Sequence, residues 1–222
     1  MREPPCGGFP WGTRQNWTLT IDIHKLEVIS NDNMNLKLII TDFDGTLVNS
    51  FEANYQAYAD AFEQCGQKLT YDLYKLCFGY RYDDFMHTAG INDVDIQQRI
   101  RKIKGEVYPF YFDYLQPNKP LINFIRAFHR DGGNTAIAST ARRLNLTNAL
   151  QYLHLTEIFD CIWAGEDVAH GKPNPEIYLK VMERMEVSAG QTLIFEDSGV
   201  GFEAAEASGA QYIRINQAFY GD

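Results

Sequence analysis

The sequence lacks the marks of several large classes of protein. Its four cysteines, Cys6, Cys65, Cys77 and Cys161, form no close pair, which argues against a zinc site and against a disulfide scaffold. No apolar run approaches the roughly 20 residues that span a bilayer. The N-terminus also lacks the basic and then apolar order of a signal peptide. We therefore expect reduced thiols, a cytoplasmic location and no membrane partner.

Positive charge is scarce as well. The chain has 20 Lys and Arg residues against 29 Asp and Glu residues, a formal net charge of -9, so it has no general attraction for a phosphate backbone or an anionic membrane. The aromatic residues from Tyr108 to Tyr114 have no basic patch beside them and are interpreted as packing, not as a base-stacking surface. Nucleic acid is therefore not an expected partner, and a small anionic substrate would need positive charge within its own site.

What the chain does contain is enough apolar material for a core. With 222 residues and a hydrophobic share of 45%, it is expected to form one domain, or one domain with a modest insertion. Residues 1–33 hold Pro and Gly pairs and show little periodicity. They are expected to be an N-terminal extension that is either disordered or not part of the native protein. Met34 stands directly before the first strand pattern, and a translation start there is one hypothesis.

Strand and helix patterns alternate through most of the remaining chain. Strands are predicted at Asn35–Thr41, Asn134–Ala138, Phe159–Ala164, Thr192–Phe195 and Tyr212–Ile215. Helices are predicted at Pro120–Arg130, Leu144–Leu153, Pro175–Met185 and Gly201–Ala207. This order predicts the α/β fold class, with a Rossmann-like parallel sheet, helices on both of its faces and sites at the carboxyl ends of its strands.

The stretch from residue 51 to residue 115 interrupts this alternation. It is dense in Tyr and Phe, carries helical patterns and has few strand signals. We predict that it is an inserted α-helical module, and that residues 34–50 and 116–222 together form the Rossmann-like core.

Two acidic residues follow the first predicted strand. Asp42 and Asp44 are separated by one residue, so both carboxylates can point to one side, and Gly45 permits a tight turn after them. A carboxylate is ionised at neutral pH, so Asp42 could attack phosphorus directly, while Asp44 could protonate the leaving oxygen and later activate water. Taken alone, the same residues could equally form a polar turn.

Groups that could bind phosphate follow later strands. Ser139 and Thr140 come directly after the strand that ends at Ala138, where hydroxyls and backbone amides can hold phosphate oxygens. Lys172 stands between Gly171 and Pro173, and its ammonium could neutralise a transferring phosphoryl group. Without their surroundings, Ser139 would be interpreted as a helix cap and Lys172 as a surface lysine.

A second acidic pair follows the strand at Thr192–Phe195. Glu196 and Asp197, combined with Asp42 and Asp44, would make an oxygen-rich pocket suited to a hard cation such as Mg²⁺. That cation would offset the repulsion between the acids and a substrate phosphate. Alone, the pair would be interpreted as an acidic loop.

Together these segments resemble the four motifs of the haloacid dehalogenase-like hydrolase superfamily. They are, in chain order, Asp42-Phe43-Asp44-Gly45-Thr46, Ser139-Thr140, Gly171-Lys172-Pro173-Asn174-Pro175 and Glu196-Asp197-Ser198-Gly199-Val200-Gly201. The resemblance extends over essentially Met34 to Ile215. The third and fourth segments are most similar to the branch that contains β-phosphoglucomutase and many small-metabolite phosphatases.

The resemblance implies roles for the motif residues. Asp42 would be the nucleophile, and Asp44 the acid/base whose backbone carbonyl also binds metal. Ser139, with Thr140 beside it, and Lys172 would bind the substrate phosphate. The acids that would hold Mg²⁺ are Asp42, Asp44, Glu196 and Asp197.

The resemblance also implies a role for the helical module. Residues 51–115 would be the helical cap, which closes over the substrate. Arg81 falls where the family places its substrate-specificity loop, so it is a candidate to contact the end of the substrate that is not transferred. The alternative is a surface arginine paired with Asp83 or Asp84.

Several functions share this motif set. The leading hypothesis is a Mg²⁺-dependent phosphatase of a small phosphorylated metabolite, such as a sugar phosphate, that works through an aspartyl phosphate. The alternative is a β-phosphoglucomutase-like mutase, which is weakened because Asn54 stands where those mutases carry a histidine. Asp44 argues against a carbon-halogen dehalogenase, and the complete set argues against a silent binding module. The sequence leaves monomer and homodimer equally open.

Overall fold

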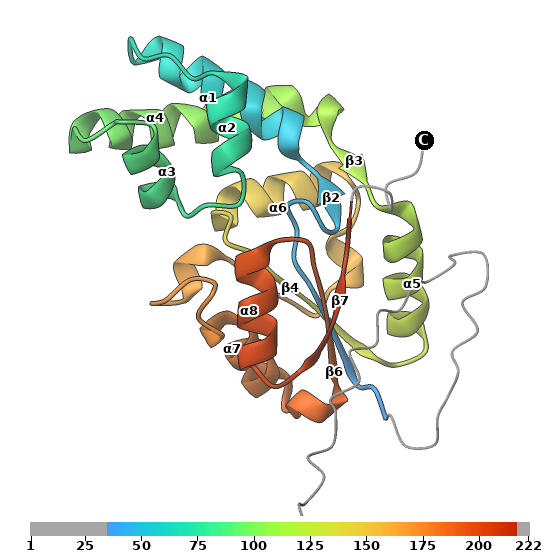
Figure 1. The fold of residues 1–222 in the computed structure, drawn as a ribbon. Coiled ribbons are helices and arrows are strands. Elements are labelled where there is room, and N and C mark those ends of the chain that lie inside the picture. The colour runs from blue at the N-terminus through green and yellow to red at the C-terminus, as the bar shows by residue number, and fades with distance from the viewer. Residues whose placement is uncertain (1–34, 217–222) are drawn as a thin grey trace, which may run out of the picture. The chain divides into compact units, whose positions relative to one another are not determined.

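The computed structural model describes residues 35–216 (Figure 1). The predictions of an N-terminal extension at residues 1–33 and of a translation start at Met34 therefore lie outside the described residues. Five parallel strands form the main sheet in the order β5-β4-β1-β6-β7. Their bounds are β1 Leu38–Thr41, β4 Asn134–Ala138, β5 Cys161–Trp163, β6 Thr192–Glu196 and β7 Gln211–Arg214.

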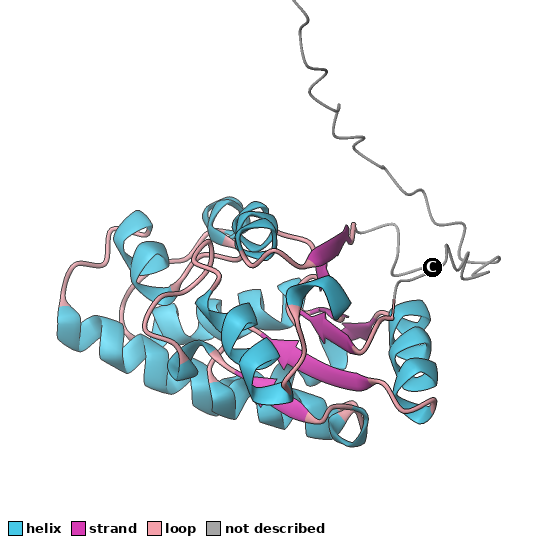
Figure 2. Ribbon diagram, turned by 90° about the horizontal axis from the view of Figure 1, so that it is seen from below, coloured by secondary structure: helices cyan, strands magenta, loops and turns pink. Residues whose placement is uncertain are grey.

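Helices cover both faces of this sheet (Figures 1 and 2). Ile39 of β1 lies in an apolar cluster with residues of α5 (Lys119–Arg130) and α6 (Arg143–Tyr152). Leu38 and Ile40 lie in a second cluster with residues of α7 (Glu176–Met185) and α8 (Gly199–Ala207). Successive side chains of a strand point to opposite faces, so a strand covered on both sides needs apolar residues throughout. The predicted α/β class is confirmed.

The first central strand is buried along its whole length. All four residues of β1 are buried, and Ile40 pairs with Ala136 on β4 and with Ile194 on β6. The strand is shorter than the predicted Asn35–Thr41 because its ladder begins at Leu38. Its central position places the residues that follow Thr41 between the ends of two neighbouring strands.

The inserted segment is helical, as predicted, and has a core of its own. It comprises α1 (Phe51–Gln64), α2 (Tyr71–Cys77), α3 (Tyr82–Thr88), α4 (Val94–Val107) and the 3₁₀ segment η2 (Tyr108–Tyr114). We call residues 51–115 the helical segment. Its apolar cluster includes Phe62, Tyr74, Phe85, Met86 and Ile100. Within η2, Tyr108 and Phe112 are buried, whereas Phe110 is 80% exposed.

A short antiparallel ribbon joins the helical segment to the sheet region. Strand β2 (Val48–Asn49) enters the segment and pairs with β3 (Gln116–Pro117), which leaves it. Sequence patterns did not predict this ribbon, since two residues carry no periodicity. The remaining short 3₁₀ segments are η3 (Thr156–Ile158), η4 (Gly165–Asp167) and η5 (Ala189–Gln191). None of the helices between residues 35 and 216 is long and apolar enough to cross a membrane.

Candidate active site

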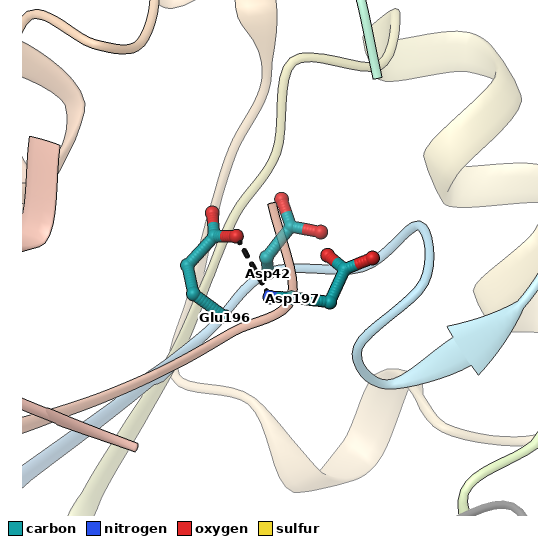
Figure 3. Close-up of side chains that lie close together, drawn as sticks. All are labelled: Asp42, Glu196 and Asp197. Carbon is teal, nitrogen blue, oxygen red and sulfur yellow. Dashed lines mark hydrogen bonds between the residues drawn. The ribbon is translucent and has the colours of Figure 1, made fainter. Parts of the chain in front are cut away.

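Three carboxylates meet at the carboxyl ends of β1 and β6. Asp42 directly follows β1, Glu196 ends β6, and Asp197 comes next. Because the two strands are parallel neighbours, the backbone amide of Asp42 can donate to the carbonyl oxygen of Phe195 at 3.0 Å. Each of the three acids offers an oxygen, and these oxygens all lie within 4.8 Å of one another (Figure 3). The sheet therefore brings Asp42 together with Glu196 and Asp197, which follow it by 154 and 155 residues in the sequence.

The ammonium of Lys172 lies beside two of these acids. Lys172 is 6% exposed, and its Nζ donates to Asp42 Oδ1 at 2.7 Å, to the carbonyl oxygen of Ala138 at 3.0 Å and to Glu196 Oε1. An ammonium has three donors, so all of them are used. The loop before α7 thus delivers a fully hydrogen-bonded cation to the end of the sheet.

The carboxylate of Glu196 is enclosed by donors from the protein. Its Oε1 accepts from Lys172 and from the hydroxyl of Tyr178 at 2.7 Å, and its Oε2 accepts from the backbone amides of Asp197 at 3.0 Å and Ser198 at 3.2 Å. Glu196 is wholly buried. Sequence reasoning did not single out Tyr178, although it ends the Pro-Glu-Ile-Tyr string that follows Lys172. Asp42 and Asp197 are thus less committed to protein donors than Glu196 is.

Burial and mutual charge control the ionisation of this group. Burial raises the pKa of Asp42 well above its usual value, since the opposing charge of Lys172 is countered by Glu196 and Asp197. Burial and the charge of Glu196 raise the pKa of Asp197 to about 7. Burial opposes ionisation of Lys172 and Glu196 as well, but their mutual attraction outweighs it, so the pKa of Lys172 is raised and that of Glu196 is lowered.

These residues fit a divalent cation. The donor set is composed of carboxylate oxygens, which hard divalent ions prefer. A cation beside Asp42 and Asp197 would also reverse the rise in pKa that their crowding and burial produce. Because both oxygens of Glu196 already accept hydrogen bonds, Asp42 and Asp197 are the better placed of the three to ligate it.

Asp44 is held by the start of the helical segment. Its Oδ1 accepts from the hydroxyl of Ser50 and from Asn54 Nδ2 at 3.1 Å. Asn54 Nδ2 also lies 3.3 Å from the hydroxyl of Tyr108. The residue that weakened the mutase interpretation therefore contacts the predicted acid/base directly. Asp44 is fixed by donors from both the loop and helix α1.

Gly45 shapes the turn between the acids. Its φ is +86°, and a Cβ atom built there would lie 2.0 Å from Asp197 Oδ2. Only glycine satisfies both the left-handed backbone and this close approach.

Gly45→Ala is expected to lower catalytic activity by about 100-fold or more, because Asp197 or the turn must shift, and displacements of about 1 Å cost that much. Gly190 is the matched control, since a Cβ atom there meets nothing within 4 Å. Steady-state kinetics of both alanine variants test this. Equal activity of Gly45→Ala and Gly190→Ala would contradict the role of the turn.

The remaining predicted residues lie around this centre. Ser139 follows β4 and is wholly buried, and its Oγ accepts from the backbone amide of Ala141 at 3.0 Å. Thr140 lines two adjoining cavities, one with Asp44 and the other with Lys172. Arg81 precedes α3 and lines the cavity that contains Lys172. Within residues 35–216 no ion pair joins Arg81 to an acid.

The cavity beside Asp44 contains cations that sequence reasoning missed. Arg101 and Lys104 of α4 line it, together with Arg142 and Tyr58. Lys104 is only 5% exposed. Burial lowers the pKa of Lys104 to about 7, against the opposing influence of Asp44. A lysine on an amphipathic helix looks like a surface residue in the sequence, so no local pattern could have revealed it.

Lys104→Met is expected to raise the free energy of unfolding by on the order of 2 kcal/mol at pH 7, because it removes a buried charge. Folding lowers the pKa of Lys104 from 10.5 to about 7, so Lys104 costs no stability above the unfolded pKa. Its cost grows as pH falls from the unfolded pKa towards about 7 and is complete below about 7. Arg142 adds to the lowering and Asp44 opposes it.

Urea denaturation at several pH values between about 6 and about 10 measures the free energy of unfolding across the pH range in which the protonation of Lys104 differs between the folded and unfolded protein. Lys102→Met is the matched control, since Lys102 lies on the same helix with a side chain 77% exposed and pairs with Glu106 at 3.9 Å. Stabilisation that is equal in the two variants, or that grows with pH, would contradict the prediction.

Comparison with known proteins agrees with this arrangement. The family model for haloacid dehalogenase-like hydrolases matches residues 39–215. A phosphorylated carbohydrates phosphatase of Thermotoga maritima is 28% identical over 184 residues, 80% of this chain and 84% of that protein. A fructose-1-phosphate phosphatase of Escherichia coli is 26% identical over 183 residues, 80% of this chain and 95% of that protein.

A solved structure shares the fold. The crystal structure of CbbY from Rhodobacter sphaeroides in complex with phosphate has a TM-score of 0.72 at 24% identity, and the match covers 83% of this chain and 88% of that chain. The resemblance found in the sequence motifs is thus confirmed over most of the described residues. The chain belongs to the haloacid dehalogenase-like hydrolase family.

Proposed function

We propose that the chain is a Mg²⁺-dependent phosphatase that hydrolyses a small phosphorylated metabolite through an aspartyl phosphate on Asp42. The observation that carries this proposal is the meeting of Asp42, Lys172 and Asp197 at the ends of β1 and β6, with Asp44 on the adjoining turn. A carboxylate beside a charged lysine and a cation site is an arrangement suited to receiving a phosphoryl group.

In the first step the carboxylate of Asp42 attacks phosphorus. A bond forms between a carboxylate oxygen and phosphorus, and the bond from phosphorus to the leaving oxygen breaks. Lys172 holds Asp42 Oδ1 at 2.7 Å, which orients the nucleophile and offsets the charge of the incoming phosphoryl group. Asp44, held by Ser50 and Asn54, gives its proton to the leaving oxygen.

In the second step water takes the phosphoryl group from Asp42. Asp44 now accepts a proton from that water, so the same residue serves first as acid and then as base. The bond between Asp42 and phosphorus breaks, inorganic phosphate leaves, and the carboxylate is restored.

The proposed cation site completes this arrangement. Mg²⁺ bound there would neutralise charge between the acids and the substrate phosphate. Asp42, Asp197 and the backbone carbonyl of Asp44 would hold it. Glu196 would act at this site mainly through Lys172, because its own oxygens are engaged. Ser139, Thr140 and Lys172 are proposed to bind the phosphate.

The helical segment is proposed to act as a cap. Residues 51–115 would form it, and residues 34–50 and 116–222 would form the catalytic core. Support comes from the separate apolar cluster of the helices and from the β2–β3 ribbon, through which the chain enters and leaves the segment. Cavities shared by α4 and the loop after β4 are suited to a substrate enclosed between the two parts.

A phosphatase is favoured over a mutase. The two curated relatives described above carry phosphatase names. Asn54 contacts Asp44 in the position considered for a histidine, and an amide cannot accept or release a proton as imidazole does. Phosphorylated carbohydrates are the proposed substrate class.

Hydrolysis of an aryl phosphate tests the proposal. Purified protein is expected to release phosphate from p-nitrophenyl phosphate with Mg²⁺, to lose this activity with a chelator, and to regain it when Mg²⁺ is restored. When glucose 1-phosphate is the substrate, free phosphate should appear faster than the isomerised product, glucose 6-phosphate. Activity that the chelator does not change would refute the metal dependence, and faster isomerisation would favour a mutase.

A further inference from the structure

Tyr178 is a buried polar residue that the proposed mechanism does not use. It lies in the first turn of α7 and is wholly buried, and its ring belongs to the apolar cluster that also contains Ile177 and Val181. Packing in that cluster requires only the ring, which phenylalanine would supply equally well. The hydroxyl instead donates to Glu196 Oε1 at 2.7 Å. The polar end of Tyr178 is therefore directed at the candidate active site.

Tyr178 and Lys172 share one oxygen of Glu196. Oε1 accepts both from the hydroxyl and from the ammonium, and a carboxylate oxygen has two lone pairs, so these two donors fill it. Lys172 keeps a second N–H group for Asp42 Oδ1, at 2.7 Å. The hydrogen bond that orients the proposed nucleophile thus belongs to a chain that runs from Tyr178 through Glu196 and Lys172 to Asp42.

The other oxygen of Glu196 is fixed from the opposite side. Oε2 accepts from the backbone amides of Asp197 at 3.0 Å and Ser198 at 3.2 Å. A Cβ atom built on Gly201, in the first turn of α8, would lie 2.1 Å from Oε2, so the carboxylate has no room to move towards that helix. Loss of the Tyr178 hydroxyl would open space on the α7 side alone. Glu196 would then shift towards α7 and draw Lys172 away from Asp42.

The ring of Tyr178 contacts the same lysine. Lys172 Nζ lies 5.1 Å from the ring centroid, at a distance from which an aromatic face attracts a cation. Phenylalanine would keep this contact and the packing of the ring. Tyr178→Phe therefore removes only the hydrogen bond to Glu196.

We propose that Tyr178 is a positioning residue for phosphoryl transfer, whose hydroxyl fixes Glu196 so that Lys172 keeps its hydrogen bond to Asp42. This inference rests on the proposed function, because it takes Asp42 as the residue that receives the phosphoryl group. Tyr178 lines neither of the two cavities described above. It should therefore affect the rate of the reaction much more than the binding of substrate.

Steady-state kinetics of Tyr178→Phe test the inference. With p-nitrophenyl phosphate and saturating Mg²⁺, kcat is expected to fall by about 10-fold while KM stays within about 2-fold. Tyr111→Phe is the matched control, since the Tyr111 hydroxyl donates to Asp60 Oδ2 at 2.8 Å within the helical segment. It loses the same type of hydrogen bond away from the site, and its kcat should stay within about 2-fold of that of the unmodified protein. A thermal melt of each variant verifies that it is folded.

A double-mutant cycle separates positioning from a purely structural role. In a Glu196→Gln background, Tyr178→Phe should change kcat by less than about 2-fold, because the charged group through which Tyr178 acts is already lost. A structural role would give the same loss in both backgrounds. Glu196→Asp, whose carboxylate is withdrawn from Tyr178 by one methylene, replaces Glu196→Gln if the latter does not fold.

Two results would overturn the inference. One is a kcat of Tyr178→Phe within about 2-fold of that of the unmodified protein, and the other is a loss that is equally large in the Glu196 background. Either result leaves the proposed function standing, provided that the unmodified protein hydrolyses the aryl phosphate. Absence of hydrolysis by the unmodified protein would refute the proposed function itself.

Discussion

Asp42→Asn is expected to lower kcat for aryl phosphate hydrolysis by about 10⁴-fold or more, because an amide cannot replace a carboxylate nucleophile. The substitution is nearly isosteric and keeps an acceptor for Lys172, which donates to Asp42 Oδ1 at 2.7 Å. The loss should therefore occur without unfolding. Steady-state kinetics and a thermal melt of the same sample measure the two effects.

A trapped intermediate would strengthen this result. Acid quenching of the unmodified protein during turnover should leave one phosphoryl group on the peptide that contains Asp42, as mass spectrometry can detect. Asp131→Asn is the control for the same type of substitution, since the side chain of Asp131 is 76% exposed and has no catalytic or binding role in the proposed mechanism. Undiminished activity of Asp42→Asn would remove the mechanism.

Lys172→Met is expected to lower the free energy of unfolding by about 3–5 kcal/mol, because it leaves buried acids without their counter-charge. Glu196 is wholly buried and Asp42 is 6% exposed, so water cannot replace the lost ammonium. Equilibrium unfolding in urea at neutral pH measures the change. Activity should fall as well, since Lys172 orients the nucleophile.

The surface offers a matched lysine for comparison. Lys180 pairs with Glu176 at 2.9 Å, but its side chain is 38% exposed, so Lys180→Met is expected to cost less than about 1 kcal/mol. Lys172→Met/Glu196→Gln should recover part of the stability lost by Lys172→Met, because the second substitution removes the buried negative charge of Glu196 that no longer has a counter-charge. Equal losses for the two lysine variants would contradict the buried ion pair.

Most of the sheet could be predicted because its strands are locally encoded. Strand β4 has the predicted bounds Asn134–Ala138, since a short apolar run between a Gly-Gly turn and polar residues admits few alternatives. Strand β5 is shorter than the predicted Phe159–Ala164, because only Cys161–Trp163 pair with β4. Length is decided by the partner strand, which the local sequence does not contain.

Other features depended on contacts between distant segments. The hydrogen bond from Tyr178 to Glu196 and the burial of Lys104 involve residues that look ordinary on a helix. The β2–β3 ribbon is too short to leave a periodic pattern. Hydrophobic periodicity reports which face of one element is buried, but not which polar groups another element brings to it.

The sequence by itself determined the alternating α/β order, the helical insertion and the set of motif residues, because each depends on local periodicity or on residue type. Only the tertiary structure decided that Lys172 lies between Asp42 and Glu196, that Glu196 is enclosed by donors, and that Lys104 is buried against the rings of Tyr58 and Tyr108. The physical reason is that charge, hydration and pKa depend on neighbours in space. Those neighbours are set when the parallel strands bring their carboxyl ends together.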